Sequence, residues 1–180
     1  MARLIKQVSS ALLLILSGVS AGQALAATTD IKATVMDGNC QVAIDTPTLK
    51  FDTKDVTQFA TGTAAILPLA VSVNCEGMQG KTPSLTVSGE SAQLSDTQLF
   101  RSASSTAKYV GFMLKKGTLN NLSDFYNAAG TVAPGDSVAI TQDDGTSVQP
   151  FSVGLVRSAG DPLLTAGAVS AKITFAFIFP

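Results

Sequence analysis

Apolar and polar residues alternate through most of the chain, and the strictest example is its last segment. That segment reads GAVSAKITFAFIFP, from Gly167 to Pro180. Its large or apolar side chains occupy every second position: Val169, Ala171, Ile173, Phe175, Phe177 and Phe179. Successive side chains of a β-strand point to opposite faces, so the alternation predicts a strand with one strongly apolar face. The chain thus ends in a strand that is expected to be covered, although order and burial usually fade at a terminus.

The same period of two recurs in short runs along the chain, and residues that favour turns separate the runs. Between Cys40 and the last segment, the apolar members are Val42, Ile44, Leu49, Phe51, Leu67, Leu69, Val71, Val73, Leu85, Val87, Val110, Phe112, Leu114, Val138, Ile140, Phe151, Val153 and Leu155. Runs at this spacing are typical of an antiparallel sandwich or barrel. No useful stretch has the apolar period and caps of a helix, although LNNLSDFYNAAG is compatible with one short helical turn. The sequence therefore predicts an all-β chain.

The first 26 residues have the features of a secretory signal peptide. Arg3 and Lys6 precede the short apolar run ALLLILSGV, and the sequence Ala24, Leu25, Ala26 supplies the small-x-small pattern of a cleavage site. The run is shorter than the roughly 20 apolar residues of a transmembrane helix, and nothing after it approaches that length. We therefore expect residues 1–26 to be removed, leaving an exported, soluble chain that is not an integral membrane protein.

The mature chain is expected to be one domain with a mildly acidic surface. The 154 residues left of the 180 suit a single domain with a sizeable core, and no internal repeat, linker or charge block divides them. Without Arg3 and Lys6, ten basic residues stand against 13 acidic residues, a net charge of about −3. This charge gives no reason to expect nucleic acid or an anionic lipid surface as a partner.

Cys40 and Cys75 are the only two cysteines. An exported chain with an even number of cysteines is expected to pair them in an oxidising compartment. Closing this interval would stabilise the fold by about 3 to 4 kcal/mol through the unfolded state. A metal site is not expected, because two thiolates would need histidine or further thiolates nearby and the chain has no histidine.

Candidate catalytic groups are scarce. Without histidine the commonest general base is absent, which weighs against hydrolases of the Ser-His-Asp and Cys-His types. The carboxylate pairs Asp52 with Asp55 and Asp143 with Asp144 lie beside turns and are expected to be solvated, as are Lys115 and Lys116. QDDGTS lacks the alternating acids and distal Glu of a calcium loop, and no Gly-rich phosphate loop precedes a helix. We expect neither a cofactor nor enzymatic activity.

A second alternating segment lies before Cys40. Thr29, Ile31, Ala33 and Val35 share one face of this stretch, which would be free to leave the domain once the leader is cleaved. A free strand can be added to an exposed sheet edge of another molecule, where backbone hydrogen bonds give affinity and alternate side chains fill pockets. The N-terminal segment is therefore a candidate donor strand.

Taken together, these features resemble the chaperone-usher pilin family, the fimbrial subunits of Gram-negative bacteria, and in particular type 1 fimbria-like subunits. The resemblance spans the mature chain. It rests on the N-terminal alternating segment, on Cys40 and Cys75, on the VGFML strand with Gly111, and on the tail. In the family the last strand carries a glycine at the fourteenth position from the end and an aromatic residue at the penultimate one; Gly167 and Phe179 stand at these positions.

The resemblance implies an immunoglobulin-like β-sandwich that lacks its final strand and is completed by donor-strand complementation. Residues 27–39 would be the N-terminal donor extension and residues 40–180 the pilin domain. A periplasmic chaperone would bind the groove beside the last strand, an outer-membrane usher would export the subunit, and a neighbouring subunit's N-terminal strand would replace the chaperone. The groove strand would comprise Gly167, Val169, Ala171, Ile173, Phe175, Phe177 and Phe179, and this chain's own donor side chains would be Thr29, Ile31, Ala33 and Val35. The product would be a cell-surface fimbrium that supports adhesion.

Two residues depart from the family pattern, which usually has glycine where Ala33 stands and tyrosine where Phe179 stands. The methyl group of Ala33 would narrow the choice of neighbour, which favours a minor or adaptor subunit over the bulk rod subunit. A self-contained secreted carbohydrate-binding or adhesin sandwich, whose last strand lies in a complete core, is the alternative of a different class. A secreted enzyme is a further alternative that no motif in the chain favours.

Overall fold

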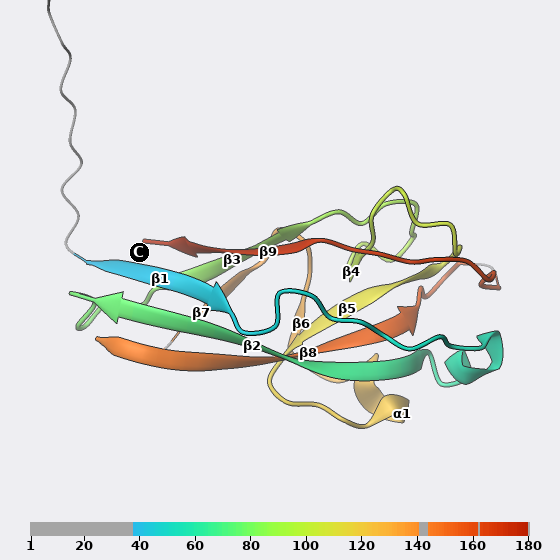
Figure 1. The fold of residues 1–180 in the computed structure, drawn as a ribbon, viewed down its shortest axis with the longest axis horizontal. Coiled ribbons are helices and arrows are strands. Elements are labelled where there is room, and N and C mark those ends of the chain that lie inside the picture. Colours follow the sequence, from blue (N-terminus) through green and yellow to red (C-terminus); the bar gives the residue numbers. More distant parts are fainter. Residues whose placement is uncertain (1–37, 141–143, 162, 180) are drawn as a thin grey trace, which may run out of the picture. The chain divides into compact units, whose positions relative to one another are not determined.

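The computed structural model describes residues 38–140, 144–161 and 163–179 (Figure 1). The described residues form two antiparallel sheets, and the segments that connect the strands include only two short helical turns. The donor side chains predicted between residues 29 and 35, and the predicted signal peptide, lie outside the described residues. No helix in the described part of the chain is both long and apolar enough to span a membrane.

The larger sheet has the strand order β1-β2-β8-β5-β4, and β6 also pairs with β5. These strands are β1 (Asn39–Ile44), β2 (Thr63–Glu76), β4 (Leu99–Phe100), β5 (Val110–Lys116), β6 (Thr131–Val132) and β8 (Gly145–Arg157). The long strands β2 and β8 pair along almost their whole length, and β8 continues the ladder onto β5. They form the centre of the sheet, with β1 at one edge.

The smaller sheet has the order β7-β3-β9, with β3 (Ser84–Gly89), β7 (Ser137–Ala139) and β9 (Ile173–Ile178). Two short turns complete the described elements, η1 (Val56–Phe59) and α1 (Leu122–Phe125). The Asp55 side chain caps η1 by accepting a 2.9 Å hydrogen bond from the Thr57 N–H, and Asn121 caps α1 in the same way through the Ser123 N–H. The α1 turn falls within LNNLSDFYNAAG, as predicted.

The core lies between the inward faces of the two sheets. Its fully or almost fully buried members come from the alternating runs, and they include Val71, Val73, Leu85, Val87, Leu114, Val138, Ile140, Phe151, Val153 and Phe175. The rings of Phe151 and Phe175 meet across the sheets with centroids 5.3 Å apart. The predicted all-β architecture is therefore confirmed, and its alternating residues do form the core.

Two predicted strand segments differ in the structure. The run containing Leu49 and Phe51 is coil, because β1 ends at Ile44, the last N–H bonded to β2 is that of Asp45, and Pro47 cannot donate to a ladder. Both side chains nevertheless pack against the core. The last strand begins at Ile173 rather than at Val169, because the residues before it bond to a loop instead of a strand.

Candidate functional site: a groove beside the last strand

A cavity of about 900 Å³ runs beside β9 and the segment that leads into it. One wall is formed by residues 164–171 together with Ile173 and Phe175, and the opposite wall by Ile44 and the coil of residues 46–56. In Figure 1 this coil follows the β1 arrow and leads to η1. The larger sheet supplies an apolar floor that comprises Leu69, Val110, Phe112, Val153 and Leu155. The groove therefore opens the space between the two sheets along one side of the sandwich.

The free edge of β9 borders this groove. Among the described strands, β9 pairs only with β3, opposite which Val87 faces Phe175. The N–H and C=O of Val87 bond to Asp136 and Gly135 on the β7 side, so the Val87–Phe175 pair exchanges no hydrogen bonds. The backbone groups of Phe175, and by alternation those of Ile173 and Phe177, consequently point away from β3 to the free edge.

The residues predicted for this strand share one face. Val169, Ala171 and Ile173 are half-buried and line the groove, and Phe175 is buried at its floor. Phe177 and Phe179 are half-buried and pack on the core beyond the groove, whereas every intervening residue from Ser170 to Ile178 is exposed. The strand thus has an apolar inner face and a polar outer face along its whole length.

The end of β9 is held by aromatic contacts. The rings of Phe177 and Phe179 meet edge to face with centroids 6.4 Å apart. The ammonium of Lys81 lies 5.1 Å from the centroid of the Phe179 ring, a cation–π contact. The phenylalanine at the penultimate position therefore has a partner of its own within the domain.

The beginning of the groove wall is held by a loop. Gly167 has a φ of +155°, and a Cβ at this position would lie 2.4 Å from the Ala107 nitrogen. The carbonyl of Ala168 accepts hydrogen bonds from the N–H groups of Thr106 and Ala107, at 2.8 and 2.9 Å. The glycine therefore allows the wall to approach the backbone of the 102–107 loop closely.

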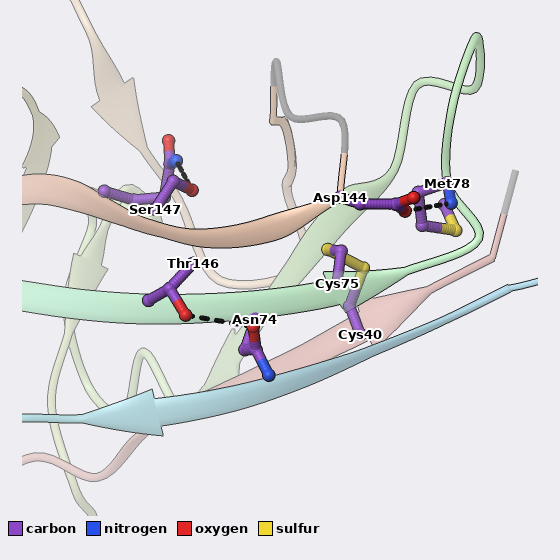
Figure 2. The surroundings of a disulfide bond; sticks show 8 residues. Cys40, Asn74, Cys75, Met78, Asp144, Thr146 and Ser147 are labelled. Atoms are coloured by element: carbon purple, nitrogen blue, oxygen red, sulfur yellow. Dashed lines mark hydrogen bonds between the residues drawn. A yellow bond between two sulfur atoms is a disulfide. The ribbon is translucent and has the colours of Figure 1, made fainter.

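A disulfide joins Cys40 and Cys75, as predicted, and links directly opposed residues of β1 and β2 (Figure 2). Figure 2 also shows Asp144, at the start of β8, whose carboxylate accepts a 2.9 Å hydrogen bond from the Met78 N–H. Met78 is fully buried, and a Cβ at Gly38 would lie 2.7 Å from its sulfur. The disulfide and this turn together fix the point at which the described chain begins.

The acidic residues singled out in the sequence have structural contacts. Asp55 caps η1, and the hydrogen bonds from Thr57 hold the pKa of its carboxyl below the ordinary value. Asp144 holds the Met78 turn, and Asp143 lies outside the described residues. Among the described residues no group of three or more His, Cys, Asp or Glu side chains has the arrangement of a metal site.

Two buried cations were not foreseen. Lys115, predicted to be solvated, is fully buried and donates to the carbonyls of Tyr126 and Ala128 and to the Thr131 hydroxyl; burial lowers its pKa. Arg101, which no sequence pattern singled out, is also buried. The only available signal was negative: each lies beside buried apolar residues in a run where a solvated residue is hard to place.

Two solved structures share this architecture. The P pilus rod subunit PapA aligns with a TM-score of 0.56 and 15% sequence identity, over 78% of this chain and 99% of the PapA chain. The chain has the fold of a fimbrial subunit. A Burkholderia pseudomallei antigen and type I fimbria protein aligns with a TM-score of 0.50 and 16% identity, over 79% of this chain and 99% of that one. No family model matches the sequence, and neither does any curated protein. The immunoglobulin-like sandwich predicted from the sequence is thus the fold of these fimbrial subunits.

Proposed function

We propose that this chain is a structural, non-enzymatic subunit of a fimbria, polymerised by donor-strand exchange through a periplasmic chaperone and an outer-membrane usher. The observation that carries the proposal is the pairing of an apolar groove with an unpaired strand edge. Ile173 and Phe175 direct their side chains toward the groove and core, and their backbone N–H and C=O groups toward the edge. A single added strand would satisfy both requirements at once.

The energies involved favour such an exchange. Burial of one large apolar side chain stabilises by roughly 1.5 to 3 kcal/mol, and each backbone hydrogen bond contributes about 1 kcal/mol more. Four or five donor side chains would therefore bind strongly to the groove. We infer that the subunit is stable only with a donor and that an unoccupied groove leads to aggregation.

The proposed donor of this chain is its own N-terminal segment, through Thr29, Ile31, Ala33 and Val35. In the assembled fibre this segment would enter the groove of the next subunit, while the chain's own groove receives the segment of the subunit on its other side. Before assembly, the periplasmic chaperone would occupy the groove. The product is a surface fimbrium that supports adhesion, and the Ala33 methyl favours a minor or adaptor position in it.

The test uses the mature chain from Ala27 with its own donor disabled by Ile31→Asp, together with a synthetic peptide of residues 27–37. We expect the chain to be unstable or aggregated alone and to become a monomer with a cooperative melting transition when the peptide is added. The matched control is Thr34→Asp, which adds the same charge on the opposite face of the donor and should leave self-polymerisation intact. A monomer that melts reversibly and ignores the peptide would instead identify a self-contained secreted binding module.

A further inference from the structure

Arg101 is a buried cation whose hydrogen bonds all go to uncharged acceptors. It follows β4 and is 1% exposed. Nη1 donates to the carbonyl of Ala92 at 2.9 Å and to Gln93 Oε1 at 3.2 Å. Nη2 donates to the carbonyls of Ser105 at 2.9 Å and Ala107 at 2.7 Å, and Nε has no partner among the described residues. A buried guanidinium without a counter-ion is unfavourable, so an apolar side chain would serve better if filling space were its only role.

The guanidinium is one peptide group away from the groove wall. The carbonyl of Ser105 accepts from Arg101, and the N–H of the same peptide group, which belongs to Thr106, donates to the Ala168 carbonyl at 2.8 Å. The Ala107 N–H donates to the same carbonyl at 2.9 Å, while the Ala107 carbonyl accepts from Arg101. Two successive residues of the loop therefore contact Arg101 on one side and the wall on the other.

A further set of bonds fixes the next residue of the wall. The Ser102 N–H donates to the Ser170 carbonyl at 2.8 Å, and the Ser170 N–H donates to the Ser105 hydroxyl oxygen at 3.1 Å. Residues 167–170 line the groove but pair with no described strand. Their position consequently depends on the 102–107 loop, and the loop is held from behind by Arg101.

We propose that Arg101 is a positioning residue for the end of the groove formed by residues 167–170, acting through the Ser105–Thr106 peptide group. This inference rests on the proposed function, in which the groove receives a donor strand. Arg101 does not touch that strand. It sets where the wall stands, and hence how well the donor side chain at that end is held.

The test measures how fast labelled peptides leave the complex with the Ile31→Asp chain. Three peptides of residues 27–37 are compared: the unchanged one, one with Thr29→Gly and one with Val35→Gly, which weaken opposite ends of the donor. We expect Arg101→Met to speed release of the unchanged peptide about tenfold. The same tenfold should persist for one altered peptide and vanish for the other, because the lost contact lies at one end.

Controls separate positioning from general loosening. Lys115→Met removes the other buried cation, which bonds to the Tyr126–Thr131 segment and does not line the groove, and it should not change the ratio between the three peptides. Arg101→Lys keeps the charge but not the fork, so it should behave like Arg101→Met. Ser105→Ala, which removes only the hydroxyl bonded to Ser170, should give a smaller loss at the same end, and it takes over the test if the Arg101 variants do not fold.

An equal acceleration for all three peptides, or none, would overturn the inference. If no peptide binds the chain with Arg101 intact, the proposed function fails instead. Amide hydrogen exchange then still decides the positioning role: Arg101→Met should speed exchange at Thr106 and Ala107 at least tenfold while Lys115→Met leaves it unchanged. Unaltered protection at these two amides in Arg101→Met would exclude that role.

Discussion

Phe151 of β8 and Phe175 of β9 bring the two sheets into contact, with ring centroids 5.3 Å apart. Phe175 is also the residue whose backbone faces the free edge, so one position serves the core, the groove floor and the unpaired ladder. The loss of this ring should therefore weaken the sandwich as a whole as well as the groove.

We predict that Phe175→Ala lowers the free energy of unfolding by about 3 to 5 kcal/mol, the usual range for a buried phenylalanine. Urea unfolding of the chain with bound donor peptide measures it. Ile178→Ala is the matched control on the same strand, because Ile178 is 45% exposed, and its effect should stay below about 1 kcal/mol. Similar losses for both variants would mean that the alternation of β9 does not describe its packing.

The sequence predicted those features of the fold that depend on local periodicity. The alternation from Val169 to Phe179 survives in the burial of β9 and the segment before it, although only Ile173–Ile178 is paired. The two cysteines were paired correctly because an even count in an exported chain leaves one arrangement.

The groove's walls were harder to foresee, because they are built from contacts between distant segments. The coil of residues 46–56 forms one wall although its alternating residues Leu49 and Phe51 suggested a strand. Arg101 and Lys115 are buried because carbonyl oxygens converge on them from other loops, and no spacing along the chain reports this. Loop conformation sets the site, whereas side-chain pattern sets the sheets.

Gly167 should tolerate no side chain. A Cβ there would lie 2.4 Å from the Ala107 backbone nitrogen, so Gly167→Ala would displace the wall from the 102–107 loop. We predict a loss of about 2 to 3 kcal/mol in unfolding free energy, from overpacking and backbone strain together. Gly160→Ala is the control: its φ is +77°, but nothing lies within 4 Å of the added Cβ, so strain alone should cost about 1 kcal/mol. Equal losses would show that the contact with the loop is dispensable.

Tyr126 should make stability fall at alkaline pH. Burial, followed by the hydrogen bond from its hydroxyl to Asp96, raises the pKa of Tyr126 to about 12 from an ordinary value near 10. The neutral form is favoured in the folded state, so its contribution is complete below pH 10 and is lost as pH rises from 10 to 12. Because the ring is partly exposed, we expect a loss of only about 1 kcal/mol at pH 11.

Urea midpoints between pH 8 and pH 11 measure this contribution, with Tyr126→Phe as the reference that lacks the ionisable hydroxyl. The difference between the two proteins should shrink above pH 10, whatever the lysines do in common. A difference that stays constant up to pH 11 would contradict the raised pKa.

A charge on the inner face of β9 should prevent capture of a donor, whereas the same charge one residue further along should not. Ile173 is half-buried and lines the groove, and Thr174 is exposed on the opposite face of the strand. Ile173→Asp would place a carboxylate without a partner among apolar groups, at a cost of several kcal/mol. We predict that this variant loses at least a hundredfold in affinity for the peptide of residues 27–37, measured by fluorescence anisotropy. Thr174→Asp should bind within about threefold of the unchanged chain, because its carboxylate stays in water. If both variants bind alike, the donor does not lie against the inner face of β9.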